Sequence, residues 1–250
     1  MIKLKTPEEI LIMQEGGRKL RTVVKELLSK IKPRVTTKYI DEEAERLILR
    51  EGGESSFKKV KNYKWSTCLP INEQIVHTPP SERIIKAGDI LTLDIGLYFK
   101  GYHTDYATTF VVGNETTEEN NFFLQVGKNA LSKAMDKVKS GTHLGEISKT
   151  IQEEIEENGF YVIPDLTGHG IGQDLHEDPF VPGFLDTDVR KTYKMKPGLV
   201  IAVEVIYSKG TRKMVFEKDS DWSIKTVDNS LAACFEHTLA ITGKNTLILT

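Results

Sequence analysis

The sequence has few cysteines, no long apolar run and almost no excess of charge, and each shortage excludes a class of protein. Its two cysteines, Cys68 and Cys234, are too few for a disulfide framework, and reduced thiols are typical of a cytoplasmic protein. No stretch of about 18 apolar residues occurs, so we expect no membrane span. Residues 1–8 become polar too early for a signal peptide. The 34 basic and 36 acidic residues leave a net charge of −2, which argues against nucleic acid or a membrane surface as the main partner.

The hydrophobic pattern predicts two pairs of helices separated by strands. A capping sequence at Thr6-Pro7 begins a helix that ends before Pro33, and a second helix follows to Arg50. Further helices are expected over 117–139, with both Phe122 and Phe123 on the buried face, and over 143–158; residues 55–65 are expected to form a surface loop. Strands are expected over 68–76, 200–207 and 232–242. The repeated order predicts one α+β domain, residues 1–250, built from two related halves.

The chain is organised around a hairpin formed by residues 90–96 and 102–110, with Lys100-Gly101 as the turn. Folding the chain about the midpoint between Phe99 and Lys100 places Asp94 opposite Asp105. Directly opposed Cβ atoms are roughly 4.5–5.5 Å apart, and like charges at that distance destabilise a sheet. A metal ion between the two aspartates is the simplest way to remove the repulsion.

Two more carboxylates interrupt apolar runs, which is costly for a charged group. Glu204 lies within the apolar run 199–206 (LVIAVEVI), and Glu236 lies within the run 231–239 (LAACFEHTL). Either could form a buried ion pair, but neither run contains lysine or arginine. Four such acids carry enough charge for two divalent ions, which in hydrolytic sites lie about 3.5–4 Å apart.

Histidines offer nitrogen ligands, but any one of them, considered by itself, is more often a structural or surface residue than a metal ligand. His169 lies between two glycines, His176 follows seven residues later, and His77 ends the first expected strand. His103 and His237 flank candidate ligands and are expected only to support them. Carboxylates with one imidazole suit Mn, Fe, Co or Zn rather than a thiolate-rich structural zinc site.

Five segments in a fixed order resemble the bacterial-type methionine aminopeptidases, over nearly the whole chain from Thr6 onward. They are 72–77 (NEQIVH), 88–105, which contains Asp94 and Asp105, 167–179 (TGHGIGQDLHEDP), 196–204 (KPGLVIAVE) and 222–238, which ends in FEHT. The resemblance implies the pita-bread fold, in which two pseudo-twofold-related halves share a curved antiparallel sheet covered by helices. It also implies removal of the N-terminal methionine from nascent proteins by a metal-bound hydroxide.

The same resemblance assigns roles to ten residues. The metal ligands would be Asp94, Asp105, His169, Glu204 and Glu236, with Asp105 and Glu236 bridging two divalent ions. His176 would stabilise the oxyanion, His77 would contact the amide nitrogen at the scissile bond, and Glu204 would transfer the proton. Cys68, Tyr63 and Trp222 would line the methionine pocket, although ordinary core packing explains them equally well.

Departures from the family pattern leave the size of the pocket and the preference for the second residue open. They are Thr78 after the first histidine, Val205 after the strand glutamate and Leu175 before His176. One alternative is a Xaa-Pro aminopeptidase or dipeptidase of the same fold, for whose usual extra domain 250 residues leave no room. Another is a pita-bread binding protein without catalysis. We expect a monomer, with docking on ribosomes left open.

Overall fold

The structure is a computed structural model that describes residues 1–250. One large antiparallel sheet forms its centre, and its strands follow the order β1 (Glu54–Ser55), β4 (Ile90–Phe99), β5 (Tyr102–Val111), β12 (Ala232–Ile241), β9 (Val200–Ser208), β7 (Thr167–Gly170) and β8 (Glu177–Pro182). Three short strands extend it: β2 (Thr67–Cys68) beside β4, β6 (Tyr161–Val162) beside β9, and β13 (Thr246–Ile248) beside β12. A second small sheet joins β10 (Met214–Phe216), β11 (Ile224–Thr226) and β3 (Gln74–Val76).

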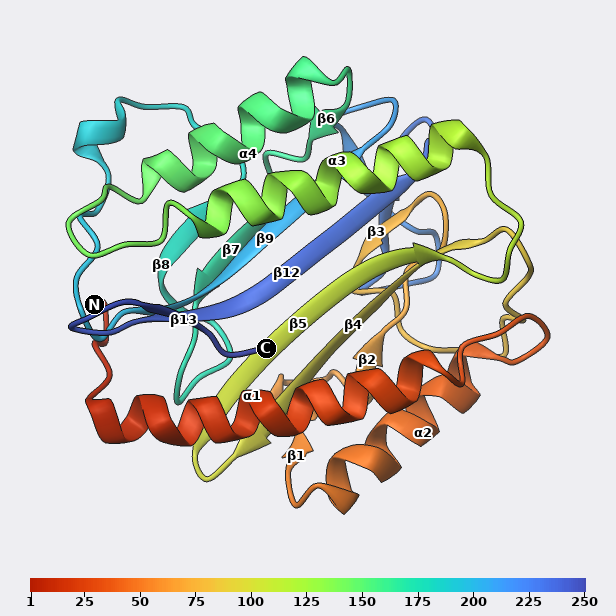
Figure 1. Ribbon diagram of the computed structural model, residues 1–250. Coiled ribbons are helices and arrows are strands. Elements are labelled where there is room, and N and C mark those ends of the chain that lie inside the picture. The colour runs from red at the N-terminus through yellow and green to blue at the C-terminus, as the bar shows by residue number, and fades with distance from the viewer.

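Four helices cover one face of the large sheet in two pairs (Figure 1). Helices α1 (Pro7–Leu28) and α2 (Thr37–Arg50) lie over the half that contains β4 and β5, and α3 (Glu118–Met135) and α4 (Gly145–Glu157) lie over the half that contains β9 and β12. Two helix pairs on two halves of one sheet are the arrangement of the pita-bread fold, as predicted. None of the helices is both long and apolar enough to cross a membrane.

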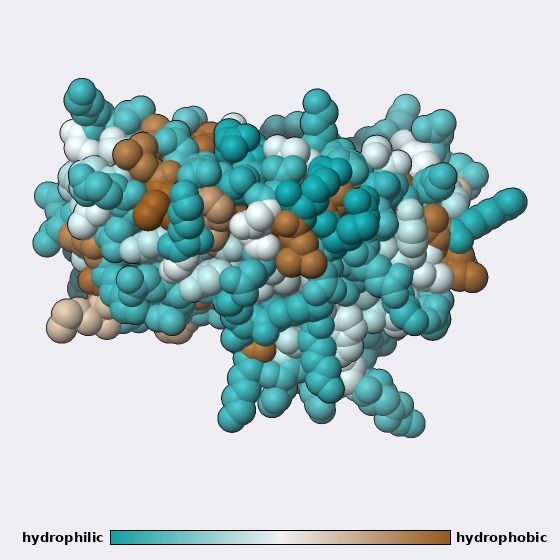
Figure 2. Space-filling view, turned by 90° about the horizontal axis from the view of Figure 1, so that it is seen from below, coloured by the Kyte–Doolittle hydropathy of each residue, from teal (hydrophilic) through white to brown (hydrophobic).

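Helix α1 begins where its capping sequence predicts. The backbone N–H of Glu9 donates to Thr6 Oγ1 at 3.3 Å, and the N–H of Thr6 donates to Glu9 Oε2 at 2.7 Å. This reciprocal cap satisfies two backbone donors, and losing such a cap costs about 1 kcal/mol. The face of the molecule seen from below carries mainly hydrophilic side chains, with hydrophobic residues in small separate groups (Figure 2).

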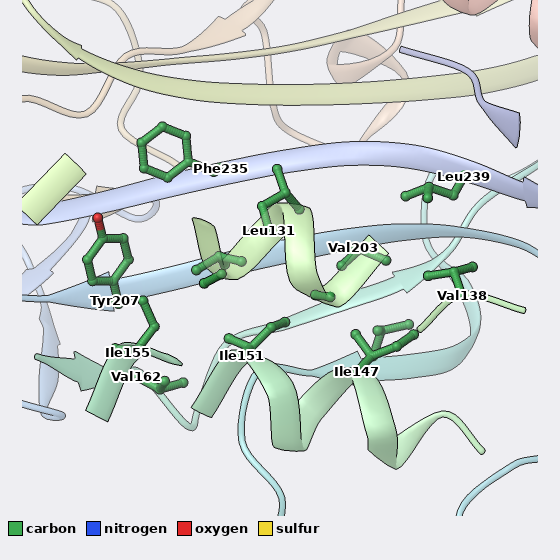
Figure 3. Packing of buried hydrophobic residues seen from close by; sticks show 14 of the residues in the cluster. Leu131, Val138, Ile147, Ile151, Ile155, Val162, Val203, Tyr207, Phe235 and Leu239 are labelled. Carbon is green, nitrogen blue, oxygen red and sulfur yellow. The ribbon is translucent and has the colours of Figure 1, made fainter. Parts of the chain in front are cut away.

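Alternation along the central strands divides the side chains between a helix-covered face and an open face. Val203 of β9 and Leu239 of β12 pack against α3 and α4, with Leu131 and Ile151 from the helices (Figure 3). The equivalent residues of β4, such as Leu93, pack against α1 and α2. The neighbouring residues in each strand therefore point to the other face, where Asp94, Glu204 and Glu236 lie.

Three local predictions are wrong. The expected strand over 68–76 is two short strands, β2 and β3, because Asn72 between them adopts a positive φ of 61° and interrupts the extended chain. Helix α3 ends at Met135 rather than at residue 139. Phe122 is 50% exposed, since the buried face of α3 runs through its neighbour Phe123 instead.

Candidate active site

The hairpin that carries the two aspartates turns at Lys100 and Gly101, which both have positive φ, 48° and 92°. Two such residues make a type I′ turn, so Phe99 pairs with Tyr102 and the strands are symmetric about the Lys100–Gly101 bond. The predicted pairing of Asp94 with Asp105 is therefore wrong by two residues: Asp94 lies opposite Ala107, and Asp105 opposite Gly96. A shift of two keeps both side chains on the same face, as diagonal neighbours roughly 7–8 Å apart.

The four carboxylates and His169 lie in two adjacent rows across five strands. The first row is Asp94, Ala107, Glu236 and Glu204, which are paired in register across β4, β5, β12 and β9. Asp105 lies two residues from Ala107 along β5, and His169 of β7 pairs with Ala202, two residues before Glu204. All of these residues face the side of the sheet opposite the helices, and the small side chain of Ala107 leaves space between the acids.

The ligand atoms of Asp105, His169 and Glu236 all lie within 4.8 Å of one another, and all three residues are buried. The Nδ1 atom of His169 is 2.9 Å from the carbonyl oxygen of Gly170. Because a carbonyl only accepts hydrogen bonds, Nδ1 carries the hydrogen and Nε2 has the lone pair. That Nε2 atom is 3.5 Å from Glu204 Oε1, so the imidazole is oriented as a ligand toward the carboxylates.

No lysine or arginine forms an ion pair with these acids; the imidazole of His169 lies beside Glu204 but carries no charge, because burial lowers its pKa to about 3. Burial raises the pKa values of Asp94, Glu204 and Glu236 well above their usual range, and the negative charge of Asp105 raises them further. Burial also raises the pKa of Asp105 to about 7. The Oε1 atom of Glu236 is buried without a hydrogen-bond partner. A buried, unpaired group of oxygen donors with one imidazole fits divalent cations, which supply the missing positive charge.

All ten predicted site residues line a single cavity of about 110 Å³. Phe57, Val60 and Leu175 complete its lining, and the sequence analysis had not placed Phe57 and Val60 in the site. The expected surface loop over 55–65 is instead partly buried, since Phe57 and Tyr63 are 6% and 5% exposed. Phe57, Val60 and Tyr63 recur at intervals of three residues, and this spacing of apolar side chains indicates that one side of the segment is buried. A larger groove of about 630 Å³ beside β13 contains no histidine or cysteine.

His77 and His176 contribute rings that solvent reaches through this cavity. Loss of hydration lowers the pKa values of both imidazoles, so both are neutral at pH 7. The ring of His176 meets that of His169 edge to face, with 4.4 Å between their centres. A neutral imidazole beside the carboxylates is able to donate a hydrogen bond to a bound substrate.

The edges of aromatic rings and a sulfur atom form one wall of the cavity. The ring of Tyr63 lies 5.0 Å from that of Trp222, in edge-to-face contact. The hydroxyl of Tyr63 donates to the carbonyl of Thr67 at 2.8 Å and is 3.1 Å from the sulfur of Cys68. This wall is apolar and polarisable, which suits a thioether.

Comparison with known proteins places the chain in one family. The pattern of metallopeptidase family M24 matches residues 12–243. Methionine aminopeptidase 1 of Bacillus subtilis is 41% identical over 250 residues, which span 100% of this chain and 99% of the relative. The crystal structure of methionine aminopeptidase from Thermotoga maritima superposes with a TM-score of 0.95 at 35% identity, covering 100% of this chain and 99% of that one.

A prolidase from Pyrococcus furiosus is more distant, with a TM-score of 0.77 and 21% identity, and the match covers 99% of this chain and 65% of that one. That likeness shows a shared fold alone, whereas the closer likenesses extend over whole chains. The chain therefore belongs to metallopeptidase family M24 and, within it, to the bacterial-type methionine aminopeptidases.

Proposed function

We propose that this chain removes the N-terminal methionine from nascent proteins and peptides at a centre of two divalent metal ions. Asp94, Asp105, His169, Glu204 and Glu236 would hold the ions, with Asp105 and Glu236 shared between them. The observation that carries this proposal is the convergence of four carboxylates without a cationic side chain: Asp105 and Glu236 are buried, Asp94 and Glu204 are half-buried, and one oxygen of Glu236 has no partner. Mn, Fe, Co and Zn all suit this donor set.

When bound, the ions would supply an activated water and polarise the carbonyl of the scissile bond. The chain's own groups would complete the reaction. Glu204 would take the proton from the water and return it to the leaving amine. Neutral His176 would donate a hydrogen bond to the oxygen on which negative charge develops, and His77 would contact the amide nitrogen of the same bond.

The size and lining of the cavity support methionine as the side chain that is recognised. A cavity of about 110 Å³ is much smaller than the roughly 300–1,000 Å³ of sites for drug-sized ligands, so it accepts little more than one side chain. Tyr63, Trp222 and Cys68 present ring edges and sulfur to it. Sulfur–aromatic contacts contribute about 0.3–1.5 kcal/mol, which favours methionine over an aliphatic side chain of similar length.

Peptide specificity and metal uptake test the proposal together. The protein is treated with a chelator, dialysed, and reloaded with Mn²⁺, and its metal content is measured by mass spectrometry. The reloaded protein should cleave Met-Ala-Ser and should leave Ala-Pro peptides intact. Preference for the proline peptide would support a Xaa-Pro peptidase, and a folded protein that takes up no divalent metal at millimolar concentrations would support a non-catalytic binding role.

The remaining parts of the proposal concern the chain as a whole. We infer a single catalytic domain over residues 1–250 that acts as a monomer in the cytoplasm. The continuous large sheet, to which both halves contribute, supports one domain. Size-exclusion chromatography with light scattering checks the monomer, and co-sedimentation with purified ribosomes checks whether the chain docks there.

A further inference from the structure

A buried ion pair lies directly behind the loop that carries His176. The loop, residues 171–176, joins β7 to β8, and His176 is its last residue before Glu177 begins β8. The Nζ atom of Lys5 donates to Glu177 Oε2 at 2.5 Å. The side chains of Lys5 and Glu177 are only 4% and 3% exposed, so this pair is part of the interior although its members lie 172 residues apart in the chain.

Both members of the pair are held by further hydrogen bonds. Lys5 Nζ also donates to the carbonyl of Lys3 at 3.1 Å, and the backbone N–H of Lys5 donates to the carbonyl of Gly198 at 2.7 Å. The other oxygen of Glu177, Oε1, accepts from the backbone N–H of Asp174 at 3.2 Å. The carboxylate thus links the N-terminal segment to the loop itself.

Gly172 provides the space that the ion pair occupies. A Cβ atom at this position would lie 2.3 Å from Cε of Lys5, 2.7 Å from its Nζ and 2.9 Å from Glu177 Oε1. Any side chain at 172 would therefore displace the ammonium group from the carboxylate. The last glycine of the Gly168–Gly172 segment, for which the metal site gives no reason, is explained by this contact.

The other contacts of the loop lie mostly at its start and on the surface. The loop contains neither helix nor strand. The N–H of Ile171 donates to the carbonyl of Val200 at 3.2 Å, the N–H of His103 donates to the carbonyl of Gly172 at 2.7 Å, and an internal bond runs from Gly172 to Asp174. The side chain of Asp174 pairs with exposed Lys3 at 2.8 Å. The ring of His176 touches His169 but is exposed toward the cavity. Its position therefore depends on where the backbone of residues 174–177 is held.

We propose that Lys5 and Glu177 are positioning residues that hold His176 in place against the scissile bond. The proposal rests on the role given to His176 in the proposed function. Lys5 does not line the cavity and touches no ligand of the metal centre. Its removal should therefore alter the rate of the chemical step more than metal content or substrate binding.

A double-mutant cycle between Lys5 and His176 tests this. Lys5→Met keeps the apolar stem and removes the charge. It should lower kcat about tenfold, since small displacements of a catalytic group reduce rates by up to about 100-fold, and it should change KM and metal content less than about twofold. In the His176→Ala background, the same substitution should lower kcat less than about twofold further, because the group that it positions is already absent.

The matched control is Lys38→Met, which removes a lysine whose side chain is 55% exposed and paired with exposed Glu82, neither residue belonging to the loop; it should leave kcat within about twofold. If Lys5→Met fails to fold, Glu177→Gln replaces it in the cycle, because the amide keeps the shape of the carboxylate but loses its charge. Equal reductions of kcat in both backgrounds would overturn the proposal and indicate a purely structural ion pair. An unchanged kcat in His176→Ala alone would overturn the role of His176 itself, whatever the effect at Lys5.

Discussion

Without metal, the buried carboxylates should make the protein less stable as the pH rises above neutrality. Burial raises the pKa of Asp105 to about 7, and those of Asp94, Glu204 and Glu236 well above their usual values. A carboxyl whose folded pKa is raised holds its proton in the folded state after the unfolded chain has lost it. Its stabilising contribution is complete below the unfolded pKa of about 4 and disappears as the pH passes the folded value.

The informative window lies between about pH 6.5 and pH 8.5. Below it, buried histidines act in the opposite direction, because burial lowers the pKa of His169 to about 3 and that of His103 to about 4. Histidines of the unfolded chain are half protonated at about pH 6.5 and largely neutral only above about pH 7.5, so their opposing contribution fades across the lower half of the window. Each proton held only by the folded state then contributes a loss of about 1.4 kcal/mol per pH unit. For Asp105 alone, with a folded pKa of about 7, the loss across the window is about 0.8 kcal/mol.

Urea unfolding followed by circular dichroism, in a chelator at several pH values, measures this loss. Asp105→Asn should reduce the fall in the free energy of unfolding by about 0.8 kcal/mol or more, because the amide does not titrate and no longer repels the other acids. Asp165→Asn, at an exposed position, should leave the fall unchanged. Saturating Mn²⁺ should stabilise the native protein but not Asp105→Asn. A metal-free stability that is flat or rises between about pH 7.5 and pH 8.5, where the histidines no longer contribute, would refute the idea of unpaired buried acids.

Four further predictions concern single residues of the site. Glu236→Ala should abolish turnover of Met-Ala-Ser, and a near-native rate would contradict its bridging role. His176→Ala should keep its metal content, measured by mass spectrometry, and lower kcat by about 100-fold or more. Ala107→Leu should prevent metal uptake, measured by calorimetry, by filling the space between the acids. Thr238→Val should destabilise the protein by about 1–3 kcal/mol in urea unfolding, because the buried N–H of Asp105, which now donates to Thr238 Oγ1 at 2.9 Å, would lose its partner.

The sequence predicted the acidic site well because charged residues inside apolar strands need a physical reason. Glu204 and Glu236 were recognisable on this ground alone, and the structure pairs them directly across β9 and β12. The face shared by Asp94 and Asp105 was also predictable, although the register was not, because the position of a two-residue turn depends on backbone dihedrals. The roles of the histidines came only from the family resemblance, since a histidine's surroundings are set by distant parts of the chain.

Other features depended on tertiary contacts that local patterns do not encode. Strands β10, β11 and β13 have three residues each, which is too short for an alternating pattern to be distinguished from a loop. The residues around Phe57 were assigned to the surface because of their lysines, although their apolar side chains close the cavity. Lys5 and Glu177 pair although they lie 172 residues apart in the chain, and neither residue lies in a sequence pattern that indicates burial.

The place of the metal centre in the fold follows from the junction between the two halves. Strands β4 and β5 pair continuously from Ile90–Val111 to Phe99–Tyr102, and β12 and β9 pair from Ala232–Ser208 to Ala240–Val200. Between the halves, β5 and β12 pair at only two positions, Glu236 with Ala107 and His237 with Tyr106. On either side, threonine hydroxyls replace the backbone ladder: Thr238 bonds to Asp105, and Thr109 bonds to Cys234.

At this junction the backbone ladder is interrupted, and Asp105 and Glu236 lie on the open face of the sheet beside the interruption. Asp105 belongs to one half and Glu236 to the other, so ions held between them would bind the halves together where the backbone does so least. Evolution of a hydrolytic site at this position therefore needs no separate cavity in either half. The carboxylates proposed to bind the ions would repel one another without them, and the same residues would thus make the enzyme active when loaded and less stable when empty.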